Sequence, residues 1–457
     1  MTMDSGLRPN DEGRVDGTRH SRSRYADMRI LLIGASGLIG SAVAARLKRD
    51  GHEIVAVGRG GGPAARRVPV DRWLFLDLRG VTTPQAWRPH LAGIEAVVNC
   101  AGVLQDSSRD SPGRVHRDMP LALWAACQAA GVRRVVHFSA LGVDRGGITP
   151  FSSTKREGDD ALAASDLDWV ILRPSVVVGG PAYGGSALFR ALASLPVLPL
   201  PPRAGAVDVV QLDDVAETVA RLIGPNSPSR VALDLAGPDR LAFADIVAAY
   251  RGWLGWTPAK SFTAPGWLMG LAYRFGDALA WLGWRPPVRS TPGREIRRGA
   301  TGDNAPWRRV TGIEPRSLAA ALAASPASVQ DRWFSRLYLL KPLAIGTFAL
   351  FWVLTGLISL GPGYQRATHY MLAGGGGALS EPSVIAGAVA DIAVGCAIAW
   401  RPTAKLGLWA ALGLSAFYVA AGTILLPGLW SDPLGPMMKI WPILALNLLC
   451  LAILDER

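Results

Sequence analysis

Three glycines in a fixed spacing near the N-terminus form a candidate site for the phosphates of a dinucleotide. Gly34, Gly37 and Gly40 follow the apolar run Arg29–Ile33 and lead into the helical pattern Leu38–Arg49. In such a unit the first glycine permits a tight turn, the second lets the backbone approach a pyrophosphate, and the third allows close helix–strand packing. The free N–H groups at the start of the helix attract the phosphates. The residues expected to contact the cofactor at this turn are Gly34, Ser36, Gly37, Leu38, Ile39 and Gly40.

The residue that follows the second expected strand bears on which dinucleotide is bound. Arg59 closes that strand about twenty residues after the glycines, where an acidic residue would hydrogen-bond the ribose 2′-hydroxyl of NAD. An arginine there instead accommodates the 2′-phosphate of NADP. We therefore expect NADP, with NAD as the alternative cofactor. The alternative interpretation of Arg59 is a solvated side chain beside a flexible loop at Gly60–Gly62.

Two further strand ends carry residues suited to the rest of a dinucleotide. Asp77 and Leu78 close the third expected strand, where a carboxylate can meet the adenine amino group. Cys100, Ala101 and Gly102 close the fourth, and their small side chains allow the dinucleotide to cross the edge of the sheet. Both segments are expected to contact the cofactor.

The elements that must position these residues alternate between short apolar runs and amphipathic helical stretches. This alternation is typical of βαβ units in a parallel sheet. A Pro/Gly-rich second half follows, with one further strand at Val231–Leu235, and is expected to form a small capping region. We predict an α/β, doubly wound Rossmann sheet. The other expected strands are Arg29–Ile33, Glu53–Val57, Trp73–Leu76, Ala96–Asn99, Arg134–Ser139 and Trp169–Leu172, and the expected helices include Leu38–Arg49, Met119–Ala130 and Thr154–Ala164.

These motifs, in this order, resemble a short-chain dehydrogenase/reductase of the extended or atypical kind. The resemblance covers about residues 28 to 250. This part of the chain is also similar to the accessory Rossmann subunit of respiratory complex I. The matching motifs are the glycine triad, Asp77-Leu78, Asn99-Cys-Ala-Gly102, His137-Phe-Ser139-Ala-Leu-Gly142 and Arg173-Pro174-Ser175. The C-terminal part resembles the DoxX-like membrane domain that is fused to such reductases, on the stretches Gln330–Tyr338 and Asp432–Pro436.

The resemblance implies the roles of the residues at the reacting end of the cofactor. In this family a tyrosine lies four residues before a lysine on one helix face, and a serine ends the preceding strand. The lysine binds the nicotinamide ribose and lowers the tyrosine pKa, the phenol passes a proton to the carbonyl, and the serine orients the carbonyl. Ser139 and Lys155 match the serine and the lysine, and are the expected catalytic residues. The segment Pro174, Ser175 and Val176 is expected to line the nicotinamide pocket.

The tyrosine position of this motif holds Phe151, which has no proton to give. Losing a positioned acid typically costs about 10²- to 10⁴-fold in rate. Lys155 can still hold the ribose, so cofactor binding is expected to survive. Ser152, Ser153 or a water molecule are the candidate substitutes, and the sequence selects none of them. His116 and His137 are expected to be structural.

The last part of the chain contains four apolar stretches long enough to cross a bilayer. Arg401 and Lys405 lie in the short second loop, and further basic residues precede the first stretch. By the positive-inside rule both segments, the Rossmann domain and both termini belong to the cytoplasm. We expect a multi-pass protein of the cytoplasmic (inner) membrane. The expected spans are Pro342–Leu360, Ser383–Trp400, Ala404–Leu426 and Pro436–Leu454.

The expected organisation has four parts. Residues 1–27 are polar and Arg-rich, which predicts a disordered tail rather than a signal peptide. Residues 28–289 form the Rossmann domain with its capping region, 290–341 a linker, and 342–457 the four-span DoxX-like domain.

Composition narrows the classes of partner. The formal charge is +12, but a basic recognition helix and basic–aromatic alternation are both missing, which argues against nucleic-acid binding and favours a cationic face beside anionic lipid headgroups. The four cysteines have no metal-ligand spacing, so neither a metal site nor disulfides are expected.

Three functions remain open at this point. The first is a membrane-anchored NADP-dependent oxidoreductase acting on an apolar or membrane-resident substrate, such as a quinone or a lipid-like carbonyl. The second, favoured by Phe151, is a noncatalytic NADP(H)-binding sensor or assembly protein. In the third, the helices form a quinone- or transport-related module regulated by the Rossmann domain. Its support is Asp391, because an ionisable group within a span is costly and usually functional.

Overall fold

A parallel sheet of seven strands forms the centre of the N-terminal part. The computed structural model describes residues 27–60, 62–107, 110–145 and 149–454, so the expected tail lies outside the described residues except for Asp27. The strand order is β10-β6-β5-β4-β1-β2-β3, which confirms the predicted doubly wound Rossmann sheet. The strands are β1 (Arg29–Ile33), β2 (Glu53–Gly58), β3 (Arg72–Phe75), β4 (Ala96–Asn99), β5 (Arg134–Phe138), β6 (Asp168–Pro174) and β10 (Val231–Leu235).

Helices cover both faces of this sheet because successive strand residues point to opposite sides. Ile30 and Leu32 pack on one face with α1 (Leu38–Arg49) and α7 (Leu212–Leu222), whereas Leu31 and Ile33 pack on the other with α4 (Met119–Ala130). The helix α5 (Pro150–Ala163) lies on the second face as well, through Leu162. The strand order reverses between β1 and β4, and this switch point is where such sheets bind ligands at their carboxyl edge.

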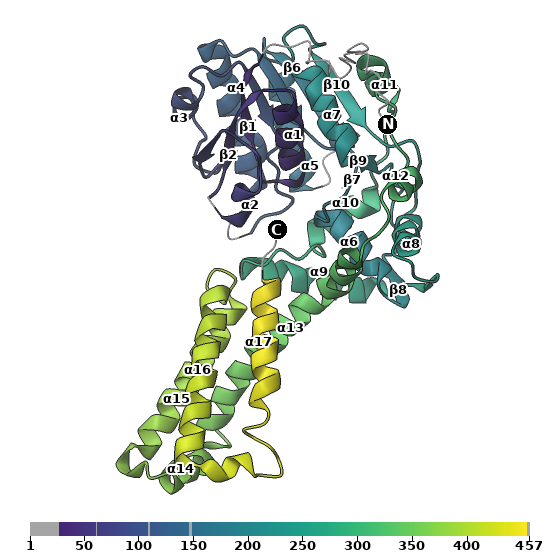
Figure 1. Cartoon of the computed structure of the whole chain (residues 1–457). Coiled ribbons are helices and arrows are strands. Elements are labelled where there is room, and N and C mark those ends of the chain that lie inside the picture. Colours follow the sequence, from purple (N-terminus) through teal and green to yellow (C-terminus); the bar gives the residue numbers. More distant parts are fainter. Residues whose placement is uncertain (1–26, 61, 108–109, 146–148, 455–457) are drawn as a thin grey trace, which may run out of the picture.

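A smaller capping region lies beside that carboxyl edge (Figure 1). It has two two-stranded parallel sheets and a hydrophobic core of its own, which includes Phe189, Phe243 and Tyr250. The elements are β7 (Val177–Val178), α6 (Gly184–Ala193), β8 (Val197–Leu200), β9 (Val210–Gln211), α8 (Phe243–Trp253), β11 (Lys260–Thr263) and α9 (Gly266–Trp281).

The segment 290–341, which the sequence analysis assigned to a linker, folds into helices that pack on both preceding parts. They are α10 (Ser290–Arg298), α11 (Ala305–Thr311), α12 (Leu318–Ala324) and the first turns of α13 (Val329–Leu360). Trp307 has no exposed surface, and its indole N–H donates to Thr218 on α7 at 2.9 Å. Leu318 belongs to the core of the capping region. Trp307 and Leu318 anchor this segment. Because these buried residues are few and far apart, the average composition of the segment stays polar, like that of a linker.

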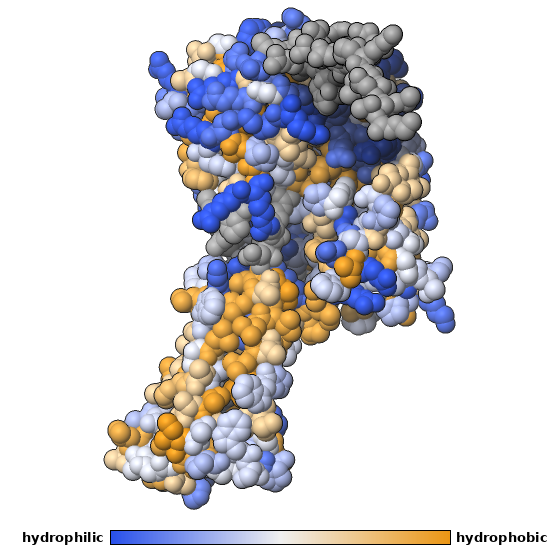
Figure 2. Space-filling view, viewed as in Figure 1, coloured by the Kyte–Doolittle hydropathy of each residue, from blue (hydrophilic) through white to orange (hydrophobic). Residues whose placement is uncertain are grey.

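The C-terminal part is a helical bundle, and among the described residues three helices are long and apolar enough to cross a membrane. These are Val329–Leu360, Gly377–Ala399 and Ala404–Leu425, and α14 (Tyr364–Ala373) lies at the far end of the bundle (Figure 1). The α-helices of the second and third are α15 (Ser380–Ala399) and α16 (Ala404–Leu425). Figure 2 shows hydrophobic residues gathered over the bundle.

The fourth expected span is shorter than predicted. Its helix, α17, begins only at Ile440 and ends at Ile453, because residues 436–439 form turns. Fourteen helical residues rise about 21 Å, against a hydrocarbon core of about 30 Å. Cys450 of α17 nevertheless packs in the bundle core with Ile345 and Leu408, so α17 is a fourth member of the bundle.

Candidate functional site

The glycine turn lies at the switch point and is packed too closely for any larger residue. Gly34 has φ +76°, and a Cβ there would lie 2.9 Å from the amide nitrogen of Ala101. A Cβ on Gly40 would lie 2.2 Å from the Gly34 carbonyl oxygen. Gly37 begins α1 without a side-chain cap, so the first N–H groups of α1, including those of Leu38 and Ile39, stay available to an anion.

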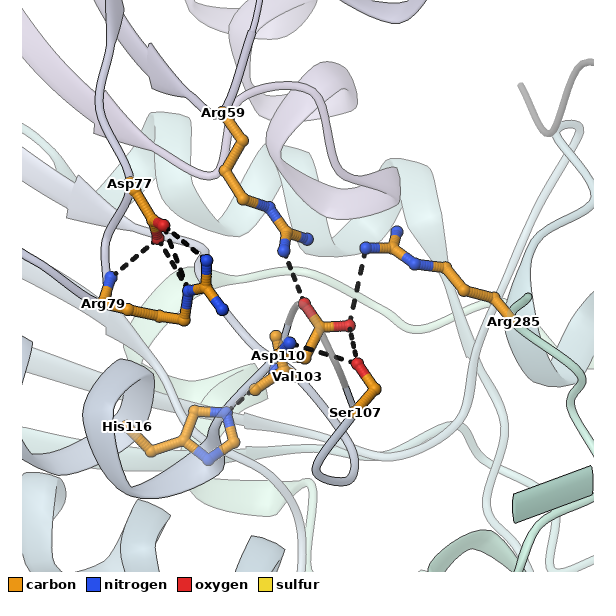
Figure 3. Close-up of polar contacts among 8 residues, drawn as sticks. All are labelled: Arg59, Asp77, Arg79, Val103, Ser107, Asp110, His116 and Arg285. Atoms are coloured by element: carbon orange, nitrogen blue, oxygen red, sulfur yellow. Dashed lines mark hydrogen bonds and ion pairs between the residues drawn. The ribbon is translucent and has the colours of Figure 1, made fainter. Parts of the chain in front are cut away.

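Arg59 lies at the end of β2, as predicted, and its guanidinium is paired with an acid that the sequence analysis did not identify. Its Nη1 is 2.5 Å from Oδ1 of Asp110, a residue of the loop that follows β4. Figure 3 shows Arg59 and Arg285 approaching Asp110 from different segments, and Arg285 lies 3.5 Å from its carboxylate. A 2′-phosphate at Arg59 would therefore compete with the Asp110 carboxylate.

Asp77, the expected partner of the adenine amino group, is also paired. Arg79 Nη2 lies 2.7 Å from Asp77 Oδ2, and the same guanidinium lowers the pKa of Asp77 (Figure 3). The carboxylate is half-exposed and stays charged at neutral pH. Leu78 packs against the hydrophobic core on the α4 face of the sheet. An adenine amino group would share Asp77 with Arg79.

A histidine fixes the backbone that follows Cys100. The His116 Nε2 atom accepts a hydrogen bond from the amide of Val103 at 3.0 Å, and its Nδ1 lies 3.2 Å from the hydroxyl of Thr154. Burial and the nearby Lys155 charge place the pKa of His116 well below its usual range. A neutral ring with its proton on Nδ1 satisfies both contacts. His116 therefore positions the Cys100–Gly102 segment and donates no proton to a ligand.

Lys155 is a second strongly perturbed basic group at this edge. Its side chain is 5% exposed, its Nζ donates to the carbonyl of Phe138 at 2.8 Å, and burial lowers its pKa to about 8. A Cβ on Gly102 would lie 3.9 Å from this Nζ. The fold thus brings Lys155, from α5, to the segment that closes β4. The same burial raises the pKa of the Cys100 thiol, which the Lys155 charge offsets in part.

Phe151 lies one turn before Lys155 on α5. The Lys155 Nζ is 5.9 Å from the centroid of the phenyl ring, and the His116 ring meets it edge-on at 5.5 Å. The four-residue spacing and this contact put both side chains on the same face of α5. The Phe151 ring thus lies near Lys155, on the helix face where the resemblance implies a tyrosine.

The Ser139 hydroxyl is hydrogen-bonded to an acid further along α5. Its Oγ donates to Oδ2 of Asp159 at 2.6 Å, and both residues are buried. Asp159 also lies 3.3 Å from His137 Nε2 and 3.7 Å from Arg173 Nε. The hydroxyl proton of Ser139 is thus committed to a buried carboxylate, and its lone pairs remain free to accept. Asp159 lies four residues after Lys155, a spacing that could have drawn attention to it.

The segment expected to line the nicotinamide pocket joins β6 to the capping region. Pro174 ends β6, and Ser175 donates through its hydroxyl to the carbonyl of Ala300 at 2.8 Å. Val176 packs at the edge of the capping core. Ala300 follows α10, so this wall of the site is tied to the segment that leads to the bundle.

Glu295 and Arg298 of α10 hydrogen-bond to the start of α5. The Ser152 hydroxyl donates to Glu295 at 2.8 Å, and Arg298 donates to the same hydroxyl at 2.9 Å. Thr149, the N-cap of α5, donates to Glu295 at 2.5 Å. Ser152 is therefore a structural link between α10 and α5, and this contact reduces its suitability as a substitute acid.

Asp391, the ionisable residue expected within the bundle, is 3% exposed on α15. Its Oδ1 accepts a hydrogen bond of 2.8 Å from the hydroxyl of Tyr418 on α16. Within the described residues, no group of three or more His, Cys, Asp or Glu side chains could hold a metal ion.

Comparisons with known families match the two halves of the chain separately. Residues 34–224 match a family described as NAD(P)H-binding, and residues 349–448 match the DoxX-like family. The two matches confirm the predicted resemblances in their coarse form, including the fusion itself.

The curated relatives include several reductases. A ceramide reductase of Caulobacter vibrioides is 28% identical over 192 residues, which cover 41% of this chain and 58% of that protein. A photosystem II assembly factor, Ycf39 of Synechocystis, is 24% identical over 208 residues, which cover 43% of this chain and 63% of that protein. The chain thus spans less than two thirds of the length of these relatives.

Solved structures share the fold. The enzyme WbmG of Bordetella bronchiseptica, in complex with NAD, superimposes with a TM-score of 0.54 at 15% identity, over 68% of this chain and 97% of that one. The protein Pal of Bacillus thuringiensis superimposes with a TM-score of 0.51 at 16% identity, over 68% of this chain and all of that one. The chain is an NAD(P)-binding Rossmann domain fused to a C-terminal DoxX-like membrane domain.

Proposed function

We propose that this protein is a membrane-anchored, NADP(H)-dependent reductase that acts on an apolar or lipid-like substrate. The observation that carries the proposal is Lys155, a buried amine with a pKa of about 8 at the carboxyl edge of the sheet, beside Gly102 of the segment that closes β4. Perturbed basic groups in such positions are typical of functional sites. A purely structural lysine would more commonly be exposed or paired with a carboxylate.

The bound dinucleotide would supply a hydride. The residues of the chain would bind the dinucleotide and donate a proton to the substrate. The first N–H groups of α1 bind the pyrophosphate, and Lys155 is placed to donate to the nicotinamide ribose. Reduction of a carbonyl also needs one proton at its oxygen, and Phe151 supplies none. The Lys155 ammonium, close to the Phe151 ring, is the proton donor that we assign, because its pKa of about 8 suits proton transfer near neutral pH.

The preference for NADP rests on Arg59. Its guanidinium lies at the end of β2 and already holds one anionic oxygen, that of Asp110. A 2′-phosphate would replace a single carboxylate charge by a more highly charged group with three acceptor oxygens.

The membrane-resident class of substrate rests on the DoxX-like domain and on the ceramide reductase among the relatives. We place the Rossmann domain in the cytoplasm. Lys341 and Arg401 both lie within 3.2 Å of the Leu454 carbonyl, so basic residues gather at the bundle end that faces the Rossmann domain.

A second candidate function is noncatalytic NADP(H) sensing or assembly. It is favoured by Phe151 together with the commitment of the Ser139 hydroxyl to Asp159, which remove two of the groups that the resemblance assigns to catalysis. A photosystem II assembly factor is among the relatives.

Oxidation of NADPH by the full-length protein in nanodiscs, supplied with lipids and quinones extracted from its own membranes, separates these candidates. We expect oxidation in the parent and in Lys48→Ala, whose lysine pairs with Asp71 on the surface, and its loss in Lys155→Ala. Equal oxidation in the parent and in Lys155→Ala would contradict the assignment. Tight NADPH binding with no oxidation in any fraction would favour the sensor.

A further inference from the structure

The helix α9 presents an apolar face that nothing in the described chain covers. Trp267 is 73% exposed and Phe275 is 65% exposed, values that are unusual for large hydrophobic side chains. At 100° per residue the exposed apolar side chains fall within one side of the helix. They are Trp267, Leu268, Leu271, Phe275, Trp281 and Leu282, the last one residue beyond α9.

The opposite face of α9 packs on the protein through small residues. A Cβ on Gly276 would lie 1.9 Å from the carbonyl oxygen of Val288, and Ala280 is buried. The helix is therefore held firmly against its own domain. Its apolar face is a fixed surface rather than the exposed side of a mobile segment.

The C-terminal end of α9 is docked on the bundle. The Arg401 amide donates to the carbonyl of Leu282 at 3.0 Å, and Trp284 donates to the carbonyl of Ala399 at 2.7 Å. The Arg401 guanidinium also lies over the Trp284 ring, 5.5 Å from its centroid. Ala399 ends α15, and Arg401 lies in the loop between α15 and α16. The C-terminal end of α9 therefore lies at the level where these two candidate spans meet.

The surface of the bundle continues into this region. Figure 2 shows hydrophobic residues over the bundle up to its junction with the rest of the protein, and Figure 1 shows α9 at that junction. Tryptophans near both ends of α9 and the exposed Arg274 on the same side suit the boundary between headgroups and acyl chains.

We propose that α9 lies in the plane of the membrane interface, with its apolar face among the lipid acyl chains of the leaflet next to the Rossmann domain. Amphipathic helices of this kind bury their apolar side about 5–10 Å into the headgroup boundary. The occupant of the face is the lipid bilayer itself, because the face is continuous with the apolar surface of helices that are long enough to cross a membrane. This inference does not depend on any enzymatic activity.

The opposite face of α9 reaches the loop that follows β4. The Gln105 amide donates to Asp277 at 2.8 Å and to Ser290 at 3.1 Å, while Arg289 donates to the Asp106 carbonyl at 2.7 Å. The same loop carries Asp110, the partner of Arg59. A helix seated in the lipid interface therefore fixes the loop beside the dinucleotide site at a set height above the bilayer.

The test is the depth of a fluorescent label on the full-length protein in nanodiscs. The parent carries Cys396→Ser, which removes the exposed cysteine, while burial raises the pKa of the Cys100 thiol and slows its labelling. Leu271→Cys places the label on the apolar face of α9. Leu121→Cys, at a leucine 42% exposed on α4, is the matched control. Lipids with a nitroxide near the headgroup end or near the methyl end of the chain, and aqueous iodide, are the quenchers.

We expect the label at position 271 to be quenched mainly by the nitroxide near the headgroup end and weakly by iodide. The label at position 121 should be quenched by iodide alone. Quenching of the 271 label by iodide alone would overturn the proposal, as would stronger quenching by the nitroxide near the methyl end. Failure of a folded Leu271→Cys protein to label would also overturn it, since another segment or copy would then cover the face.

Discussion

The two ends of the candidate dinucleotide site differ in the groups that form them. The phosphate end consists of backbone: Gly34 and Gly40 leave no room for a Cβ, and the start of α1 offers uncapped N–H groups. The nicotinamide end consists of single side chains, and two of them depart from the expected pattern. Phe151 replaces an acid, and the Ser139 hydroxyl donates to Asp159.

This difference shows which part of the site tolerates substitution without loss of the fold. A turn that packs backbone on backbone accepts no larger residue, so cofactor binding and the fold are tied together. A proton donor is one side chain on a helix face, and its exchange leaves the helix intact. Lys155 is present and buried although the position four residues before it holds a phenylalanine.

The largest expected effect comes from restoring the acid. Phe151→Tyr should raise the rate of NADPH oxidation by about 10²- to 10⁴-fold, because a phenol one turn from Lys155 is placed to donate the proton. The affinity for NADPH should stay unchanged. Single-turnover kinetics with a saturating acceptor measure the rate, and Phe151→Leu is the control. A rate no higher than that of the parent would mean that the phenyl ring is not at the acid position or that Lys155 already supplies the proton fully.

The next largest effect concerns the phosphate end. Gly40→Ala places a Cβ 2.2 Å from the Gly34 carbonyl oxygen, and the backbone must shift. We expect about 10- to 100-fold weaker NADPH binding, corresponding to about 1–3 kcal/mol. Gly252→Ala, on α8 with open space around its Cβ, is the matched control. Equal dissociation constants for the two variants would refute the close-packing argument.

A smaller effect is expected at Arg59. Arg59→Ala should weaken NADPH binding about tenfold and leave NADH binding within about twofold, because only NADPH carries the 2′-phosphate. Arg67→Ala, at an exposed arginine a few residues further on, should change neither. Equal losses for both cofactors would show that Arg59 does not discriminate between them.

The smallest effect is a dependence of stability on pH. Burial lowers the Lys155 pKa to about 8 from its usual 10.5, so between these two values the unfolded chain binds a proton that the folded one does not. Stability without cofactor should therefore rise with pH from about 8 to about 10.5. The melting temperature, measured against pH, should show this rise in the parent and not in Lys155→Met. The same slope in both proteins would place the titrating group elsewhere.

The sequence was sufficient for the parts that depend on local pattern. The glycine turn, the doubly wound parallel sheet and the helices that follow are set by spacing and periodicity, and the structure confirms them as a Rossmann fold. Trp307 shows where such a pattern fails, since one buried indole anchors a segment whose average composition is that of a linker.

Side-chain partners across the site could not be predicted in the same way. Arg59 and Asp110 are fifty-one residues apart, and nothing in either local pattern indicates the other. Asp159 accepts a hydrogen bond from Ser139 only because α5 packs against the end of β5. The fourth span was overestimated because apolar composition already begins at residues 436–438, where the backbone still turns.

Transfer of deuterium from the cofactor tests the central claim most directly. Full-length protein in nanodiscs with its own membrane lipids would be given NADPH labelled at either face of the nicotinamide C4, and the lipid extract would be examined by mass spectrometry. The reductase account predicts that one label, and not the other, appears in a lipid-soluble product, and that Lys155→Ala abolishes its transfer. Stoichiometric NADPH binding in which neither label leaves the cofactor would contradict the account and identify a sensor instead.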